Sequence, residues 1–487
     1  MPSLVAHIGT PRRLIWPRNW QHGPDKEVKV KRLMDQTQKI QQLIEGFLNR
    51  DEPVRLSARD ELVKFGRDAV EPLLGALYES KALGICHDWI AALVQIGTPA
   101  VEPLIAALDE DWGFLLSEIV RVLGTIGDER AIQPLIEKAL INPKAHDDGA
   151  WAFEKFGEQG FQALMAVLSD PKHYDGYGRG RAASALYVFA GDVRIVEPLI
   201  ACLQDESVYV RRGAASVLGH SKNSRAFDPL MAVLSNLDAK VRKSAVRSLG
   251  YIRDTRAVDA LIVAMNDDDA EVRRVAAQSL HEFKDRRAFE SFMVGLKDPD
   301  EETRWWCACG LHSMPDIRAV DALFAAFNDD SWRVRMTVAH TVGKIGEVSL
   351  INRLLDALDN QDWRVRESAI GALRFYSDPR ATERIKQALN APEYQVRRQA
   401  ADVLGGLGES SAVEPLILAL QDTYMRESAI HALGNIGDAR VVPHLIPFLS
   451  QKDLATSSRA AKALRKIGTP EAILAVEEWE GRKNHSI

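Results

Sequence analysis

The chain has few of the residues that build disulfide frameworks, zinc sites or membrane spans. It contains four cysteines in 487 residues, Cys86, Cys202, Cys307 and Cys309, and no two of them have the CxxC spacing of a zinc site. Such sparse cysteine usage fits a reducing interior. No apolar run reaches the roughly 18 residues needed to cross a bilayer. We therefore expect a soluble, cytoplasmic protein.

The chain also lacks an excess of positive charge. Its 62 basic and 68 acidic side chains give a net charge of −6, and this balance provides no strong field for nucleic acid. We therefore expect no nucleic-acid partner, and the function must follow from the pattern of the residues that are present.

That pattern is a repeat of 31 residues. Seven arginines recur at this spacing, nearly all in a Val-Arg dipeptide, and a register of acidic residues follows six of them by twelve residues. A fixed period of this size predicts a solenoid, in which each copy buries its apolar face only against its neighbours. The arginine register is Arg211, Arg242, Arg273, Arg304, Arg335, Arg366 and Arg397. The acidic register is Asp254, Asp285, Asp316, Glu347, Asp378 and Glu409.

Each repeat contains the pattern of two short helices. In residues 238–267, Val241, Ala245 and Leu249 recur at i, i+4 and i+8 and so share one helical face. A second apolar stripe follows Asp254, which stands where an N-cap is expected. Residues of this kind predict an all-α solenoid of about fourteen two-helix repeats, wound as a right-handed superhelix.

The regularity of the repeat divides the chain into five segments. The first segment has no period, and we interpret it as a disordered arm or as upstream sequence included by a misplaced start, with Met1 and Met34 both open as the true start. The segments are 1–33, the aperiodic arm; 34–52, a capping helix; 53–182, irregular repeats with a glycine- and tyrosine-rich loop inserted at 171–181; 183–450, regular repeats; and 451–487, a C-terminal capping repeat and tail.

The repeat D-x-x-V-R-x-x-A-x-x-x-L-G-x-x-x-D-x-R-A-V-x-x-L resembles the HEAT-like repeat of phycobilisome (PBS) bilin lyases. This resemblance implies an armadillo-type α-solenoid with a concave surface that holds a client. The family includes phycobilin lyases, iron-dependent deoxyhypusine hydroxylases and noncatalytic binding scaffolds. Fold likeness does not choose among these functions.

The two charged registers have a structural interpretation. An arginine at the start of one helix can bond the acidic turn of the adjacent repeat, and such a pair fixes geometry. We therefore expect the arginine and acidic registers to latch each repeat to the next.

Evidence for catalysis or metal binding is weak in the sequence. A hydroxylase of the deoxyhypusine type requires several His-Glu dipeptides in equivalent repeats to hold two irons, whereas this chain has one, His281-Glu282. His281 and His312 lie 31 residues apart, and they are the weak candidates for a shared metal ion. The simpler interpretation is that both cap helix ends. No catalytic residue is predicted.

Aromatic residues suggest a binding surface. Trp332, Trp363 and Tyr394 hold one position in three consecutive repeats, and we expect them to stack along one edge. The tandem Trp305-Trp306 occupies places where other repeats have smaller or charged residues. At least one of these indoles is expected to be exposed, as anchors of binding surfaces are.

The second helices are expected to line the concave side of the solenoid. Arg353 and Arg384, 31 residues apart, would add positive charge beside a shallow groove on that side. The groove is predicted from small apolar residues at Ala260, Val263, Ala264, Val294, Gly295, Ala322, Ala325 and Ala326.

These observations favour a noncatalytic scaffold that binds a protein partner on the concave surface of residues 238–390. The alternative is a bilin lyase or lyase-like chaperone that attaches an open-chain tetrapyrrole to a phycobiliprotein, with Arg353 and Arg384 holding the propionates. A metal-dependent hydroxylase is the third hypothesis. The scaffold would need no cofactor and the lyase would need a bilin. The sequence does not identify a protein partner.

Overall fold

The computed structural model describes residues 24–47, 51–79, 86–109, 115–140, 146–451 and 453–484. Every regular element in these ranges is a helix, which confirms the predicted all-α class. Residues 1–23 of the expected disordered arm lie outside the described residues. The last ten residues of this segment are helical, because helix α1 begins at Pro24 and ends at Phe47, and the interpretation of a misplaced start stays a prediction.

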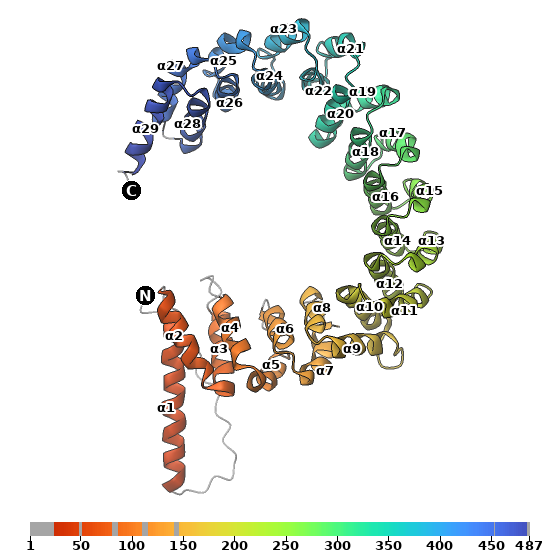
Figure 1. Ribbon diagram of the computed structural model, residues 1–487, viewed down its shortest axis with the longest axis vertical. Coiled ribbons are helices and arrows are strands. Elements are labelled where there is room, and N and C mark those ends of the chain that lie inside the picture. Colours follow the sequence, from red (N-terminus) through yellow and green to blue (C-terminus); the bar gives the residue numbers. More distant parts are fainter. Residues whose placement is uncertain are drawn as a thin grey trace. The chain divides into compact units, whose positions relative to one another are not determined.

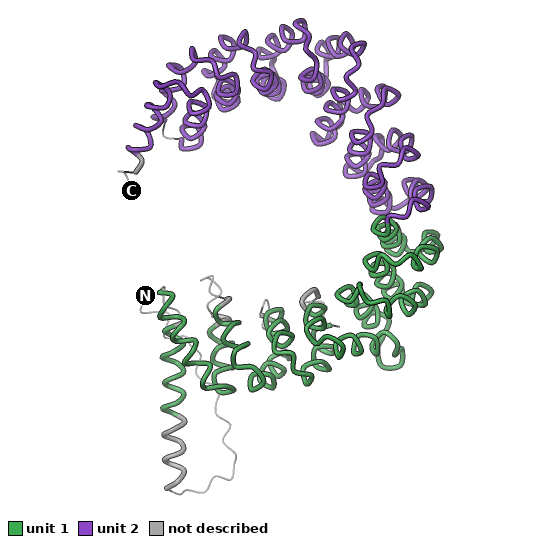
Figure 2. The backbone as a smooth tube through the Cα atoms, viewed as in Figure 1, with its two compact units in different colours: residues 1–252 green, residues 253–487 purple. Residues whose placement is uncertain are grey.

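The chain divides into two compact units, residues 1–252 and 253–487 (Figure 2). The first unit consists of paired helices that follow α1. Their bounds are α2 Glu52–Val63, α3 Val70–Glu79, α4 Cys86–Ile96, α5 Val101–Ala107, α6 Leu115–Ile126, α7 Ile132–Leu135, α8 His146–Lys155, α9 Glu158–Leu168, α10 Gly176–Ala185, α11 Val196–Cys202, α12 Val208–Ser221, α13 Phe227–Val233 and α14 Ala239–Ile252.

The second unit continues the same alternation of helices. Most second helices are shorter than the first helices and follow a single turn of 3-10 helix. The bounds are α15 Val258–Ala264, α16 Ala270–Phe283, α17 Phe289–Gly295, α18 Glu301–Ser313, α19 Val320–Ala325, α20 Trp332–Ile345, α21 Leu350–Ala357, α22 Trp363–Leu373, α23 Pro379–Ala388, α24 Tyr394–Leu407, α25 Val413–Ala419, α26 Arg426–Ile436, α27 Val442–Leu445, α28 Leu454–Ile467 and α29 Pro470–Asn484.

The second unit has two layers, which Figure 1 shows as rows of helices on the two sides of a curved stack. Successive first helices pack on one another, and each second helix packs on the first helix that follows it. This sequential packing is that of a solenoid. The inner layer consists of α16, α18, α20, α22, α24, α26 and α28, and the outer layer of α15, α17, α19, α21, α23, α25 and α27.

The repeat pattern produces the expected local structure. Val241, Ala245 and Leu249 are fully buried, as residues on one apolar helical face should be. Asp254 is the N-cap of the following 3-10 turn, and its side chain accepts a hydrogen bond from the backbone N–H of Arg256. Both features of the predicted repeat are confirmed.

The ladder arginines bind a different carboxylate from the one expected. Arg304 donates from Nη1 to the carbonyls of Asp298 and Pro299, at 2.9 and 3.1 Å. Its Nε and Nη2 hold the carboxylate of Asp329 at 2.6 and 3.0 Å. Asp329 lies in the turn that precedes the next first helix and belongs to neither predicted register. The predicted pairing of this ladder with the acidic register is therefore wrong, although the link to the next repeat exists.

Between Asp267 and Asp422, this third register of turn residues is interrupted twice. Asn360 and Ala391 stand 31 and 62 residues after Asp329, and neither carries a carboxylate. The arginines that precede them bind glutamates instead. Arg335 pairs with Glu367 and Arg366 pairs with Glu393, whereas Arg273 and Arg397 keep the regular partners Asp298 and Asp422.

The acidic register links repeats through a second series of arginines. Asp316 accepts from the backbone N–H of Arg318 and pairs with its guanidinium at 3.0 Å. The hydrogen bond from the Arg318 side chain lowers the pKa of Asp316. Arg318 also reaches Glu290, on the second helix of the preceding repeat, at 3.5 Å. The latch is thus an acid-capped turn whose arginine contacts the neighbouring repeat.

The same cap and ion pair recur at Asp254, Asp285 and Asp378. They are missing at Glu347 and Glu409, which are followed two residues later by Ser349 and Ser411. Within the described residues, the side chains of these two glutamates make no hydrogen bond or ion pair. The acidic register therefore acts as a latch only where an arginine follows it.

The loop predicted at 171–181 is partly helical, because α10 begins at Gly176. Asp175 caps this helix by accepting from the N–H of Gly178 at 2.7 Å. A Cβ at Gly180 would lie 2.6 Å from the Cβ of Tyr209 on α12. The glycines that suggested a loop instead allow two first helices to approach closely.

Candidate functional site

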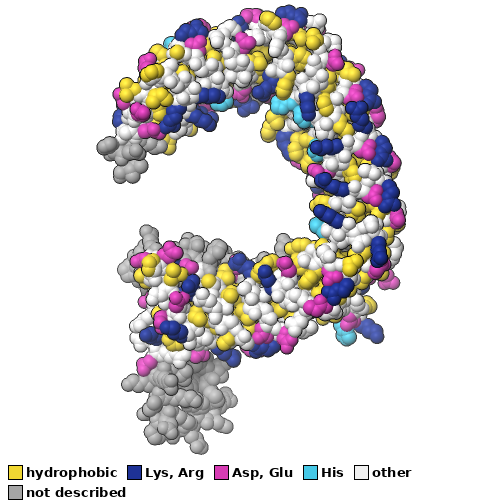
Figure 3. Space-filling model, viewed as in Figure 1, with side chains coloured by type: hydrophobic (Ala, Val, Ile, Leu, Met, Phe, Trp, Pro, Cys, Tyr) yellow, Lys and Arg dark blue, Asp and Glu magenta, His cyan; other side chains and the backbone are white. Residues whose placement is uncertain are grey.

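The candidate site is the solvent-accessible surface of the inner layer between α16 and α24, which we call the inner face. The expectation that second helices line the concave side is wrong, because first helices form this side (Figure 1). Along its edge, dark-blue basic groups and cyan histidines gather (Figure 3). The inner face includes the following residues of α16 to α24 and of the turns after them: Glu271, Arg274, His281, Glu302, Trp305, Trp306, Cys309, His312, Trp332, Arg333, Met336, His340, Lys344, Trp363, Arg364, Arg374, Phe375, Tyr394, Arg398 and Asp402.

Small residues explain why the first helices form the inner side. A Cβ at Gly405 on α24 would lie 2.6 Å from the Cα of Ala432 on α26, and one at Gly434 would lie 2.6 Å from the Cβ of Ala463 on α28. Neighbouring first helices therefore approach closely. Because the inner side of a curved stack has the shorter path, the layer with the closest helix contacts is the inner one.

Trp305 and Trp306 form the densest aromatic group of the inner face. Their ring centroids lie 4.6 Å apart, and the guanidinium of Arg333 lies 3.8 Å from the centroid of Trp305. Arg333 is also paired with Glu302, and His281 lies 5.6 Å from Trp306. Both indoles are half-buried, so the expectation of a freely exposed indole is wrong. Their contacts hold them as a rigid platform.

The aromatic residues before the ladder arginines differ in exposure. Trp332 is 62% exposed and Tyr394 is 36% exposed, whereas Trp363 is half-buried. Among the described residues no ring contact joins these three, so they do not stack on one another. Tyr394 contacts Tyr424 instead, at 6.5 Å between centroids. Trp332 is the freest of the three.

Three histidines lie on consecutive inner helices. Burial lowers the pKa of His281, of His312 and of His340, so these imidazoles are neutral at pH 7. His312 Nδ1 lies 3.2 Å from the hydroxyl of Thr341. No group of three or more His, Cys, Asp or Glu among the described residues is placed to hold a metal ion. His281 is therefore a ring neighbour of Trp306, and His312 is a partner of Thr341.

The cysteines of this region are poor nucleophiles. Burial raises the pKa of the Cys309 thiol to about 11 and raises that of Cys307 further. Both thiols are protonated at neutral pH, and the thiolate is the reactive form. The cysteines whose side chains the structure describes are free.

Arg353 and Arg384 lie away from the inner face, on the outer helices α21 and α23. Arg353 pairs with Asp321 at 2.7 Å and lies 4.1 Å from the ring centroid of Phe324. Arg384 pairs with Asp359. The interpretation that these arginines flank a concave groove is therefore wrong.

The small apolar residues predicted to form that groove belong to the outer layer as well. Val263 on α15 and Val294 on α17 are 71% and 69% exposed. They lie on the outer layer of the stack, where Figure 1 places α15 and α17. The second helices lie on the outer side of the stack because the first helices make the closer contacts between neighbouring repeats.

The sequence analysis missed the basic and apolar residues at the ends of the inner helices. Arg374 holds the place that Gly343 and Gly405 hold in the neighbouring repeats, and Phe375 beside it is 49% exposed. This replacement of glycine by arginine was the sequence signal. Lys344 and Arg398 are exposed on the adjacent helices.

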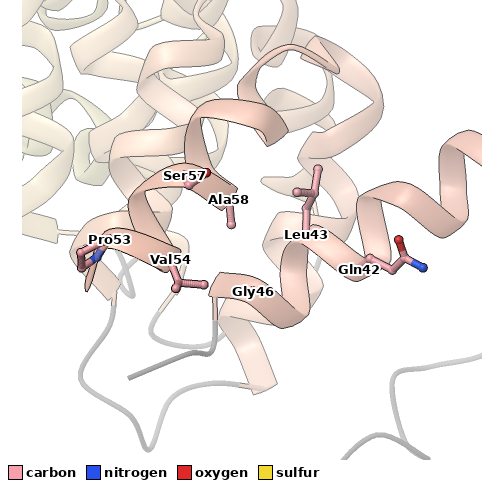
Figure 4. A pocket seen from close by; sticks show the side chains of 7 residues that line it. All are labelled: Gln42, Leu43, Gly46, Pro53, Val54, Ser57 and Ala58. Carbon is pink, nitrogen blue, oxygen red and sulfur yellow. The ribbon is translucent and has the colours of Figure 1, made fainter. Parts of the chain in front are cut away.

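Two hollows occur in the described part of the chain. One, of about 410 Å³, lies between α1 and α2 and is lined by Leu43, Val54, Ala58 and neighbouring residues without a titratable group (Figure 4). The other, of about 180 Å³, lies beside Ala391 and contains Arg366 and Arg384. Neither holds a set of groups for nucleophilic or acid–base catalysis.

No single described helix has the length and apolar composition of a membrane span, although the bent pair Asp88–Ile96 and Thr98–Ala107 passes that test together.

The HEAT-repeat family model matches six overlapping stretches: 161–238, 227–293, 289–374, 351–423, 381–453 and 413–486. These cover well over half of the sequence. The chain belongs to the HEAT-repeat family. The model of the PBS lyase HEAT-like repeat matches residues 115–139. No curated protein matches the sequence.

Among solved structures, this HEAT-repeat protein resembles yeast importin-β, Kap95p, with 15% identity and a TM-score of 0.54 over 89% of this chain and 62% of the other. A structure in which Kap95p binding induces the switch loops of RanGDP to adopt the GTP-bound conformation gives 14% identity and a TM-score of 0.54, over 90% of this chain and 62% of the other. The chain therefore spans about three fifths of the length of these relatives. At such identity the likeness shows the fold alone.

Proposed function

We propose that this HEAT-repeat protein is a noncatalytic scaffold that binds a protein partner on the inner face of its second unit. The observation that carries the proposal is the exposure of Trp332, Met336 and Phe375 at 62%, 46% and 49% on consecutive inner helices. Large apolar residues gathered on one face mark interaction sites. The Trp305-Trp306 group lies on the preceding inner helix, α18, where Arg333 of α20 covers Trp305, and tryptophans dominate binding energy at such sites.

The fold supports the same proposal. A HEAT solenoid presents an extended surface to a partner, and its structural relative Kap95p binds RanGDP. Among the described residues no group of three or more His, Cys, Asp or Glu is placed to hold a metal ion, and the thiols of Cys307 and Cys309 are protonated at neutral pH.

The bilin-lyase hypothesis loses its geometric support. It requires Arg353 and Arg384 to hold propionates in a concave groove, yet both lie in the outer layer and each is paired with a carboxylate. The hydroxylase hypothesis has no cluster of three or more ligands among the described residues. Partner binding is therefore the function that the geometry favours.

The test is quantitative co-purification of a partner that is first identified with the wild-type chain. Trp332→Ala removes an exposed indole and should weaken the complex by roughly tenfold or more, since anchor residues contribute about 2 kcal/mol. The double variant Trp305→Ala, Trp306→Ala should do the same.

The matched control is Val263→Ala, Val294→Ala, which removes exposed apolar groups from the outer layer. It should leave binding unchanged, and circular dichroism should show equal helicity in all variants. Partner binding that survives both tryptophan variants, or that is lost in the outer-layer control, would contradict the inner face as the site.

A further inference from the structure

Some basic residues of the inner face pair with carboxylates, as Arg274, Arg333 and Arg364 do, and others do not. The outer-layer arginines Arg318, Arg353 and Arg384 each pair with a carboxylate. On the inner face, Lys344, Arg374 and Arg398 have no carboxylate within 4.0 Å in the part of the chain that the structure describes. We call these three residues the basic strip.

The interruption of the turn register changes the role of two glutamates in the same repeats. Asn360 and Ala391 cannot pair with the ladder arginines, so Glu367 and Glu393 take that role. Glu367 directly follows the ladder arginine Arg366 in sequence. Arg398 holds the equivalent position in the next repeat, on α24. Its carboxylate is bound to Arg335, at 2.9 Å. Both glutamates are thereby engaged by ladder arginines.

Apolar surfaces lie between the charges of the strip. The guanidinium of Arg374 lies 5.7 Å from the ring centroid of Phe375, and Phe375 contacts His340 at 5.5 Å. Arg398 lies 5.8 Å from the ring of Tyr394. One carboxylate, Asp402, lies near enough to Arg374 and Arg398 to feel their charges. Two of the three cations therefore lie near this one acid, beside a partly apolar surface.

Charge complementarity identifies the occupant of such a surface. Resting on the proposed function, we propose that the partner docks an acidic amphipathic segment here, with its carboxylates on Lys344, Arg374 and Arg398 and its apolar side chains on Met336 and Phe375. A nucleic acid fits less well, because Asp402 interrupts the strip and the neighbouring histidines are neutral at pH 7.

The probe is a synthetic helical peptide of about 20 residues, about 30 Å long, with Glu on one face and Leu on the other. The full chain should bind it, and binding should weaken between about 0.1 M and 1 M salt, where the Debye length falls from about 10 to 3 Å. Arg374→Gln, Arg398→Gln should weaken binding roughly three- to thirtyfold, since each exposed ion pair contributes up to about 1 kcal/mol. The measurement is fluorescence anisotropy of the labelled peptide.

Two comparisons decide the inference. The matched control, Arg353→Gln, Arg384→Gln, makes the same charge change on the outer layer and should bind within about twofold of wild type. A peptide with Lys in place of Glu should not bind. The inference is overturned if the outer variant loses as much affinity, if the lysine peptide binds equally, or if a single-stranded oligonucleotide binds more tightly than the acidic peptide. Loss of peptide binding alone leaves the proposed function standing, because the tryptophan variants test that separately.

Discussion

The two layers of the second unit contain the same 31-residue period but use it differently. In the outer layer an acid-capped turn recurs, and its arginine makes an exposed ion pair with the preceding repeat, as Arg287 does with Asp259 and Arg318 does with Glu290. In the inner layer the recurring elements are buried, whereas the exposed positions vary from repeat to repeat. Repetition therefore holds the stack together, and variation on the inner layer gives each stretch of the surface its own chemistry.

The strongest test of this comparison is to remove one arginine from each layer. Arg304 is 15% exposed and its partner Asp329 is 7% exposed. Arg304→Ala leaves a buried carboxylate and two carbonyls without their donor, and should cost about 3 kcal/mol of unfolding free energy. Urea denaturation followed by circular dichroism measures this loss.

The matched change in the outer layer is Arg318→Ala. Arg318 is 57% exposed, and solvent screens its pairs with Asp316 and Glu290. Its loss should shift the urea midpoint much less than the loss of Arg304. Equal shifts would show that the outer latches contribute as much as the buried ladder.

A second, smaller effect is expected at the close contacts of the inner layer. Gly405→Ala places a Cβ 2.6 Å from the Cα of Ala432, so the two helices must separate, at a cost of about 1–3 kcal/mol. Thermal unfolding measures the loss. Gly75→Ala is the control, because a Cβ there meets no atom within 4 Å and alanine favours the helix. A destabilised Gly75→Ala would mean that helix contacts are not the cause.

The period and the helix starts were predictable because they depend on residues close in sequence. Asp254 is an N-cap and Leu249 is a core residue whatever the neighbouring repeats do. The partner of each ladder arginine was not predictable, since acids of two registers lie within its reach. The register that supplies Asp329 was also hidden in the sequence by Asn360 and Ala391.

The side of the solenoid that forms the inner face could not be predicted for a different reason. Curvature depends on distances between helices of different repeats, such as the approach of Gly405 to Ala432. The sequence shows small residues in both helices, and only the packed structure shows which of them are in contact. The superhelical sense stays a prediction for the same reason.

The smallest expected effect is a difference between the two layers in how their contributions to stability depend on pH. The pKa of His281, of His312 and of His340 is lowered by burial, so the unfolded chain binds these protons first, at a pKa of about 6.5. Their contribution to stability is intact above about pH 7 and decreases as the pH falls through 6.5. Each histidine should contribute less than about 1 kcal/mol, because half-buried groups are screened by solvent.

In the outer layer the lowered pKa of Asp316 places its loss of stability below about pH 4 instead. In the triple variant His281→Gln, His312→Gln, His340→Gln the urea midpoint should therefore depend less on pH between pH 7 and 5, the range that brackets the histidine pKa of about 6.5. The Asp316→Asn variant should change the pH dependence only in the more acidic range. An unchanged slope in the triple variant would show that the inner histidines are not what acid destabilises.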